Sequence, residues 1–267
     1  MLDIEYGQAS HPGKVRTNNE DRTGVFVPKS TLEARSRGWL FVLADGVGGV
    51  DMGEVAAATA VQVIVSEFAV CPENTTLLGF LPRLVQHANA AVHDEGLHPG
   101  RRGRPMATTI VCCAVRHDQA YIAHVGDSRC YHVRAGEATP VTRDHTWVNE
   151  QRKLGILSAS EAAQSESRHV LTRSLGPELF VSSDTTTVTL RGGDQLVLCS
   201  DGLYASLENE DIARIVSQKK TPDELAADLV NYSVELDGSD NTTAQVIAVR
   251  SVEAMAMYRG RLYPRPG

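Results

Sequence analysis

The feature that most constrains this chain is a short apolar run that ends directly on a carboxylate. Residues 39–44 read WLFVLA, and such a run, rich in aromatic and branched side chains and closed by glycines, is typical of a buried strand. Asp45 follows at once, and then come Gly46, Gly48 and Gly49. A carboxylate at the mouth of a core strand is costly unless something pairs with it. The fold therefore has to bring a partner to Asp45.

The same combination of an apolar run and an acid returns along the chain. Apolar runs lead into Asp127 and Asp201, and Asp240 stands just before another one. Any single Asp-Gly pair could be an ordinary turn, because Asp bonds its own backbone there and Gly accepts a positive φ. Several such acids together favour a cluster of divalent cations that holds them. Carboxylates without nearby His or Cys suit Mg²⁺ or Mn²⁺ rather than Zn²⁺, and a structural Ca²⁺ site is an alternative.

A polar loop at residues 13–22 adds a second functional signal. It holds Arg16 just before Glu20 and Asp21. An isolated arginine is usually a surface residue, but its planar fork also suits bidentate capture of a phosphate dianion. A metal cluster beside such an arginine indicates hydrolysis of a phosphate ester, whereas a calcium site would leave Arg16 unexplained.

Composition excludes several classes of function. The chain has 267 residues, of which 42% are hydrophobic, enough for a large domain with a core. Its 26 basic and 33 acidic residues give a net charge of −7, which argues against a nucleic-acid partner. No run approaches the roughly 20 apolar residues of a membrane span, and the acidic N-terminus does not read as a signal peptide. Five cysteines without CxxC spacing are expected to be reduced thiols of a cytoplasmic protein.

The histidines give no second metal signal. His124 lies inside a strand-like run and is expected to be a satisfied sheet residue, and His145 follows Asp144 in what we expect to be a turn. The others are scattered and are expected to be solvated: His11, His87, His93, His98, His117, His132 and His169.

Apolar periodicity predicts helices and strands without βαβ alternation. Strands are expected at 2–9, 23–28, 39–44, 108–116, 119–125, 129–134, 185–190, 195–200 and 244–250. Helices are expected at 51–70, 76–95, 208–217 and 222–236. We expect Asp51 to cap the first helix and Pro82 to delay the start of the second to near Leu81.

The remaining segments are connections. Residues 29–38 are expected to form a surface turn, and 97–104 a basic loop. An insertion at 142–176 is expected to hold short helices at 146–154 and after Ser158, which opens a capping box. The order of elements favours an α+β fold in which two antiparallel β-sheets are flanked by helices. We expect one domain over residues 1–250 and a loose or surface-docked tail at 251–267.

Taken together, these stretches resemble the metal-dependent Ser/Thr protein phosphatases (PPM, type 2C) in their bacterial form. The resemblance covers about residues 5–250 and keeps the order of the family's motifs. Each motif is weak alone, but the set is highly specific. The matching stretches are residues 16–21 (RTNNED), 43–49 (LADGVGG), 108–109, 125–129 (VGDSR), 142–145 (TRDH), 171–176 (LTRSLG), 193–203 and 239–242 (SDNT).

The resemblance implies a four-layer αββα sandwich with the metals in a cleft at one end, between the sheets. Two core ions, Mn²⁺ or Mg²⁺, and a weaker third are implied. Asp45 would bridge the core ions, the Gly46 carbonyl would bind one of them, and Asp201 and Asp240 the other. Asp127 would bind the third ion. Residues 146–170 would form a flap beside the cleft, which in this family influences substrate choice.

The resemblance also implies roles for the polar loop. Glu20 and Asp21 would hold metal-bound waters, and Arg16 would hold the substrate phosphate. The chain departs from the family pattern at Val47, where eukaryotic relatives carry a His proposed as general acid, and at Ala205, where many relatives carry a further Asp. Ala107 replaces a Gly that precedes the Thr pair in many relatives.

We therefore expect a metal-dependent protein phosphatase that hydrolyses phosphoserine and phosphothreonine by direct attack of a metal-bridging hydroxide. Its partners would be phosphorylated Ser/Thr proteins, including a cognate kinase or its substrates, with no nucleic acid and no membrane. We expect a monomer. The alternative is a phosphoprotein-binding pseudophosphatase or scaffold, for which Ala205 is the hint.

Overall fold

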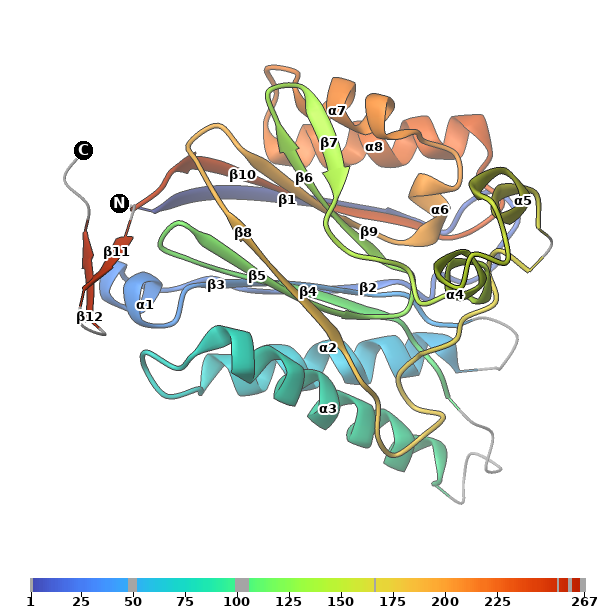
Figure 1. The fold of residues 1–267 in the computed structure, drawn as a ribbon, viewed down its shortest axis with the longest axis horizontal. Helices are drawn as coiled ribbons and strands as arrows, with labels where there is room; N and C mark the ends of the chain where they lie inside the picture. The colour runs from blue at the N-terminus through green and yellow to red at the C-terminus, as the bar shows by residue number, and fades with distance from the viewer. Residues whose placement is uncertain are drawn as a thin grey trace.

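Two five-stranded antiparallel sheets lie face to face in this computed structural model, and helices cover their outer faces (Figure 1). The structure describes residues 2–47, 52–98, 106–165, 167–253, 255–258 and 261–264. The layers run helices, sheet, sheet, helices, so the expected α+β sandwich is confirmed (Figure 1).

The first sheet has the strand order β1-β10-β9-β6-β7. Its strands are β1 (Asp3–His11), β10 (Thr242–Ser251), β9 (Gln195–Cys199), β6 (Arg129–Arg134) and β7 (Glu137–Pro140). On its outer side lie α6 (Asp201–Tyr204), α7 (Asn209–Val216) and α8 (Pro222–Leu236) (Figure 1). Helix α8 starts with a capping box, in which the Thr221 hydroxyl accepts a hydrogen bond from the Glu224 N–H, and with proline at its first turn.

The second sheet has the strand order β2-β3-β4-β5-β8. Its strands are β2 (Arg22–Phe26), β3 (Trp39–Ala44), β4 (Ile110–Arg116), β5 (Gln119–Val125) and β8 (Asp184–Thr189). Helices α2 (Gly53–Ala69) and α3 (Leu77–Gly96) pack on its outer face (Figure 1).

Strand β3 is apolar throughout because both of its faces are buried. Phe41 and Leu43 point into the space between the sheets, where they meet Leu198 and Ile247 of the opposite sheet. Leu40 and Val42 alternate with them and pack in the cluster formed with α2 and α3. The strand thus runs through the centre of the molecule and delivers Asp45 at one end of the sandwich.

Some expectations for the N-terminal half need correction. Residues 31–36 form helix α1 (Thr31–Ser36) rather than part of a turn, because the Ser30 hydroxyl caps it by accepting from the Glu33 N–H. Helix α3 begins at Leu77 and carries Pro82 inside it; burial of Leu77 and Leu81 outweighs the lost hydrogen bond. The cap of α2 is Met52, and Asp51 lies outside the described residues.

The later part of the chain holds further elements that periodicity did not indicate. These are strand β7, the single-turn helix α6, and the paired strands β11 (Met255–Tyr258) and β12 (Arg261–Pro264), which lie in the stretch expected to be a loose or surface-docked tail.

The turn at Gly126 and Asp127 carries the chain across the sandwich, because β5 and β6 belong to different sheets. The basic loop at 97–104 lies mostly outside the described residues.

All five cysteines are free and buried, as expected for reduced thiols. Within the described ranges, the chain has no helix that is both long enough and apolar enough to span a membrane.

Candidate active site

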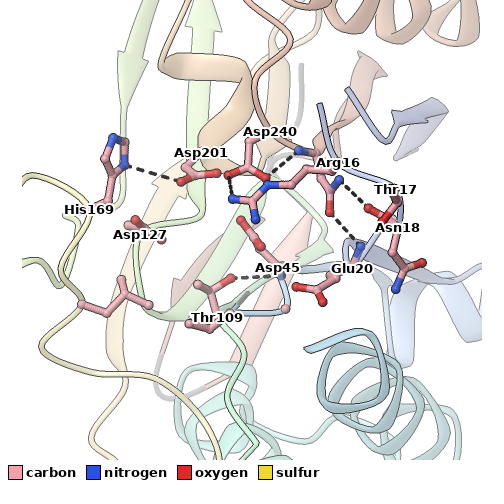
Figure 2. A pocket seen from close by; sticks show the side chains of 14 residues that line it. Arg16, Thr17, Asn18, Glu20, Asp45, Thr109, Asp127, His169, Asp201 and Asp240 are labelled. Atoms are coloured by element: carbon pink, nitrogen blue, oxygen red, sulfur yellow. Dashed lines mark hydrogen bonds and ion pairs between the residues drawn. The ribbon is translucent and has the colours of Figure 1, made fainter. Parts of the chain in front are cut away.

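Several strand ends meet at one end of the sandwich. Asp45 follows β3, Asp127 follows β5, Asp201 begins α6 directly after β9, and Asp240 precedes β10. Figure 2 shows these side chains around one cleft, which has a volume of about 230 Å³. Every predicted site residue except Asp21 lines it: Arg16, Glu20, Asp45, Gly46, Asp127, Asp201 and Asp240. The acids that are far apart in the sequence are therefore brought together.

Two glycines of the Asp-Gly pairs allow backbones to approach closely. A Cβ on Gly46 would lie 2.3 Å from the carbonyl carbon of Gly53, at the start of α2. A Cβ on Gly202 would lie 2.1 Å from the backbone oxygen of Asn241. The second approach presses the start of α6 against the segment that carries Asp240. These glycines are required by contact distance rather than by the positive φ of an ordinary Asp-Gly turn.

Hydrogen bonds to Thr108 and Thr109, just before β4, fix the backbone of Asp45. Its N–H donates to the Thr109 hydroxyl at 3.1 Å, and its carbonyl accepts from the Thr109 N–H and the Thr108 hydroxyl, each at 2.8 Å. The Thr109 hydroxyl also pairs with the Ser128 hydroxyl at 2.7 Å, beside Asp127. The carboxylate of Asp45 is left to face the cleft.

The polar loop is held on the cleft by Asn241. Its side-chain oxygen accepts from the Glu20 N–H at 2.8 Å, and its side-chain nitrogen donates to the Pro12 and Asn18 carbonyls at 2.9 Å. This places the Arg16 guanidinium beside Asp240, with 2.9 Å between Nη2 and Oδ2 (Figure 2). The hydrogen bond and charge of Asp240 raise the pKa of Arg16, so its positive charge is secure.

Asp21 lies behind the wall of the cleft. Only 4% of it is exposed, and its Oδ2 accepts from the Ser200 hydroxyl at 2.7 Å. Its Oδ1 is buried without a hydrogen-bond partner among the described residues. Burial raises the pKa of Asp21 to about 7, and the charges of Asp201 and Asp240 add to the rise. Burial also raises the pKa of the neighbouring Glu20.

Burial and mutual repulsion also act on the other acids. The pKa of Asp45 is raised well above its ordinary range by burial and by the charges of Asp21, Asp201 and Asp127. Burial and the charge of Asp201 raise the pKa of Asp127 to about 7. An opposite charge among them would reverse these shifts.

His169 is a cleft residue that sequence reasoning missed. We expected it to be solvated, but it lines the cleft, and its Nδ1 lies 3.6 Å from Asp201 Oδ2 (Figure 2). The interaction with the Asp201 carboxylate raises the pKa of His169. No local pattern marks this histidine, because it comes from the predicted flap and reaches Asp201 through tertiary folding alone.

The predicted flap at 146–170 stands beside the cleft. It holds α4 (Trp147–Lys153) and α5 (Ala159–Gln164), close to the expected bounds, and α5 begins with the Ser158 capping box. The Trp147 N–H donates to the Val170 carbonyl at 2.8 Å and joins the two ends of the flap.

The segment that leads into the flap is anchored by an ion pair. Arg129 donates two hydrogen bonds to Asp144, at 2.9 and 2.7 Å, and its guanidinium lies 3.5 Å from the ring centroid of Tyr204. His124 donates from Nε2 to the Arg143 carbonyl at 2.9 Å, so it is the satisfied sheet histidine that we expected.

The donor set fits a hard divalent cation. The donors from the predicted metal residues are carboxylate and carbonyl oxygens, and raised pKa values mark acids that lack compensating charge. In the part of the chain that the structure describes, no three His, Cys, Asp or Glu side chains lie so that they could hold a metal ion as they stand. The Asp240 carboxylate is paired with the Arg16 guanidinium instead (Figure 2).

Comparisons with known proteins agree with this geometry. A profile of the family described as protein phosphatase 2C matches residues 14–231. The protein phosphatase PhpP of Streptococcus pneumoniae is 30% identical over 253 residues, covering 94% of this chain and 100% of that protein.

Solved structures are also similar. The serine/threonine phosphatase of S. agalactiae superposes with a TM-score of 0.82 at 33% identity, over 92% of this chain and 100% of that one. The catalytic domain of the phosphatase PstP, solved in complex with two manganese ions, gives a TM-score of 0.77 at 31% identity, over 93% of this chain and 99% of that one.

The acids predict an unusual dependence of stability on pH. Asp21 and Asp127 have pKa values of about 7 in the folded protein, above the ordinary value of 3.8, so the folded state binds more protons than the unfolded state. The metal-free protein should therefore melt at a higher temperature as pH falls from about 8 to about 6. Differential scanning fluorimetry in chelator measures this. The Asp21→Asn, Asp127→Asn double variant should lose part of the dependence and keep the part that the raised pKa of Asp45 contributes, and a wild-type melting temperature that falls over this range would contradict the prediction.

A second prediction concerns Gly202. Gly202→Ala places a methyl group 2.1 Å from the Asn241 backbone oxygen, so one of the two segments must move. We expect a loss of about 1–3 kcal/mol in the free energy of unfolding, measured in urea. The control is Gly79→Ala in α3, because a Cβ at Gly79 would meet nothing within 4 Å, so this variant should be at least as stable as the wild type. If Gly202→Ala were as stable as the wild type, the proposed close contact would be wrong.

Proposed function

The chain belongs to the protein phosphatase 2C family, and on that premise we propose that it hydrolyses phosphoserine and phosphothreonine in proteins with divalent cations bound in the cleft. The observation that carries the proposal is the convergence of Asp45, Asp201 and Asp240 on one cleft that also holds Arg16. As a member of this family the protein is a protein phosphatase; the metals, the residue roles and the mechanism are the proposal.

The residues that would hold the core cations are Asp45, the Gly46 carbonyl, Asp201 and Asp240. Asp45 is suited to a bridging position because its backbone is fixed by Thr108 and Thr109 while its carboxylate faces the cleft. Mn²⁺ or Mg²⁺ bound there would supply a hydroxide for direct attack on phosphorus and would stabilise the charge that develops on it. The manganese complex of PstP supports this choice.

Arg16 is the proposed phosphate-binding residue. Its guanidinium pairs with Asp240 and is 49% exposed, so it stands at the mouth of the cleft. A cation at Asp240 would compete with that pairing and would release the fork for a bidentate contact with phosphate. Glu20, on the same loop, faces the cleft, and Asp21 stands behind it, so both carboxylates are placed to orient water.

A cysteine nucleophile is not part of the proposal. Among the described residues, none that line the cleft is a cysteine. Burial raises the pKa of Cys112 and of Cys199 to about 12, which keeps both thiols protonated. Direct attack without a phosphoenzyme is therefore the route we propose.

The departures at Val47 and Ala205 concern details of the site. Val47 lines the cleft and carries no proton to give to a leaving group. Ala205 is the residue that ends α6, and it offers no carboxylate to accompany Asp127. We propose Asp127 as the ligand of a third, weaker ion. The alternative of a catalytically inactive binding protein would require that Arg16, Asp45, Asp201 and Asp240 are retained without hydrolysis.

We further propose that the substrates are phosphorylated Ser/Thr proteins, among them a cognate kinase or its targets. A monomeric cytoplasmic protein would fit the acidic composition and the buried free thiols.

One prediction of the proposed function tests the metal ligands. Asp45→Asn and Asp240→Asn should each lower the release of phosphate from a phosphothreonine peptide by at least about 100-fold in Mn²⁺, because each removes a cation ligand. Excess chelator should abolish wild-type activity, and Mn²⁺ should restore it. The control Asp223→Asn replaces an exposed acid on α8 and should be fully active. Wild-type activity that survives the chelator would refute the metal-dependent mechanism.

Another prediction of the proposed function separates phosphate binding from metal binding. Arg16→Ala should lower kcat/KM for the phosphopeptide by roughly 10- to 100-fold, the value of a lost charge-assisted hydrogen bond. It should bind Mn²⁺ at least as tightly as the wild type, because the guanidinium no longer competes for Asp240. Isothermal titration with Mn²⁺ alone measures the second effect. Weaker Mn²⁺ binding in Arg16→Ala would show that we have misassigned this residue.

A further inference from the structure

Asp127, the proposed ligand of a third ion, lies on the turn at which the chain leaves one sheet for the other. Strand β5 ends at Val125, which pairs with Ile110 of β4, so the backbone of Gly126 lies beyond the regular hydrogen bonds of the ladder. Ala205 offers no carboxylate to accompany Asp127. The geometry of a cation site at Asp127 therefore depends on what holds this turn.

His145 holds the turn from one side. Its Nδ1 accepts a hydrogen bond from the Gly126 N–H at 3.1 Å, and its own backbone N–H donates to the Gly126 carbonyl at 2.9 Å. Both backbone polar groups of Gly126 are thus bonded to one residue of the segment that leads into the flap. Asp127 follows Gly126 directly, so these bonds fix the backbone from which its carboxylate projects.

Thr109 holds the turn from the other side. A Cβ on Gly126, which has a φ of +100°, would lie 2.7 Å from the Thr109 Cβ, so the turn is pressed against this residue. The Thr109 hydroxyl pairs with the Ser128 hydroxyl at 2.7 Å and accepts from the Asp45 N–H at 3.1 Å. Contacts with the residues before and after Asp127 therefore relate its position to that of Asp45.

The imidazole ring of His145 is held in one orientation. Only 2% of the residue is exposed, and its ring stacks on the ring of His124, with 4.7 Å between the centroids and 19° between the planes. The His124 ring is itself fixed, because its Nε2 donates to the Arg143 carbonyl at 2.9 Å. The stacked pair keeps Nδ1 of His145 directed at the Gly126 N–H.

The bond from Gly126 also fixes the place of the ring proton. A backbone N–H donates to a ring nitrogen that carries no proton, so the proton of the neutral His145 ring is on Nε2. This Nε2 lies 3.4 Å from Asp184 Oδ2. Burial, together with the neighbouring His124 and Arg173, lowers the pKa of His145 to about 4. At neutral pH the ring is therefore an acceptor at Nδ1.

We propose that His145 is a positioning residue, which acts through the Gly126 N–H to hold Asp127 where its carboxylate completes a third cation site. This inference rests on the proposed function, in which Asp127 binds that ion. His145 is not among the described residues that line the cleft, so it acts from behind the site. Replacing a residue that orients a metal ligand typically weakens metal binding by roughly 10- to 100-fold.

The experiment replaces the ring by two side chains of the same branched shape. In His145→Asn, the side-chain oxygen takes the place of Nδ1 and can still accept from Gly126, whereas in His145→Leu a methyl group stands there. Isothermal titration with Mn²⁺ alone measures the result. The weakest Mn²⁺ site should be at least about tenfold weaker in His145→Leu and within about threefold of the wild type in His145→Asn. Tighter binding at Asp45 and Asp240 should not change in either variant.

Two further variants complete the set. Asp127→Asn should abolish the weakest Mn²⁺ site, and the addition of His145→Leu to it should change Mn²⁺ binding no further. His145→Gln carries its acceptor one bond further from the backbone and should behave like His145→Leu. All the His145 variants lose the stacked ring, so their melting temperatures in chelator should all fall. A purely structural role of the ring would therefore give no difference between Asn and Leu in Mn²⁺ binding.

Several results would overturn the inference and leave the phosphatase function intact. One is a weakest Mn²⁺ site of equal affinity in the wild type and in His145→Leu, and another is an equal loss in His145→Asn and His145→Leu. A loss in His145→Leu that extends to the tighter sites, or retention of the weakest site in Asp127→Asn, would also overturn it. The proposed function itself would be overturned if the wild type in Mn²⁺ released no phosphate from phosphothreonine peptides.

Discussion

Repulsion among carboxylates gathered at one end of the sandwich is the constraint on which the site depends. Asp45, Asp127, Asp201 and Asp240 arrive there from separate strand ends, and burial with mutual proximity raises the pKa of Asp45 and of Asp127. Arg16 compensates Asp240, and His169 approaches Asp201. The fold therefore builds a region of negative potential whose free energy a bound cation would lower, and this gain is the source of the metal affinity that we propose.

The backbone makes this gathering possible through contacts that only glycine permits. Gly46 lets the start of α2 reach the end of β3, and Gly202 lets α6 rest on the Asn241 carbonyl. The Asn241 side chain in turn accepts from the Glu20 N–H and donates to the Asn18 carbonyl. These bonds fix the position of the loop that carries Arg16. The relative positions of the acids are thus set by packed backbone rather than by flexible side chains, which is what a site of defined geometry needs.

Much of this arrangement could be predicted from the sequence, because its signals are local. The apolar run before Asp45 predicted β3 with its observed bounds, and Thr221 with Glu224 predicted the start of α8. What could not be predicted depends on contacts between distant segments. His169 reaches Asp201 only through the flap, and the crossing at Asp127 separates β5 and β6 into different sheets. Helix α1 was missed because its cap, Ser30, lies in a stretch without apolar periodicity.

The central claim is that cations bind where these acids converge. It is tested most directly by anomalous scattering at the manganese absorption edge, recorded from crystals of the wild-type protein grown with Mn²⁺. The account predicts anomalous peaks in contact with Asp45, Asp201 and Asp240, with the Arg16 guanidinium displaced from Asp240. Crystals that contain ordered carboxylates at these positions, with Arg16 still on Asp240 and without a peak between them, would contradict it.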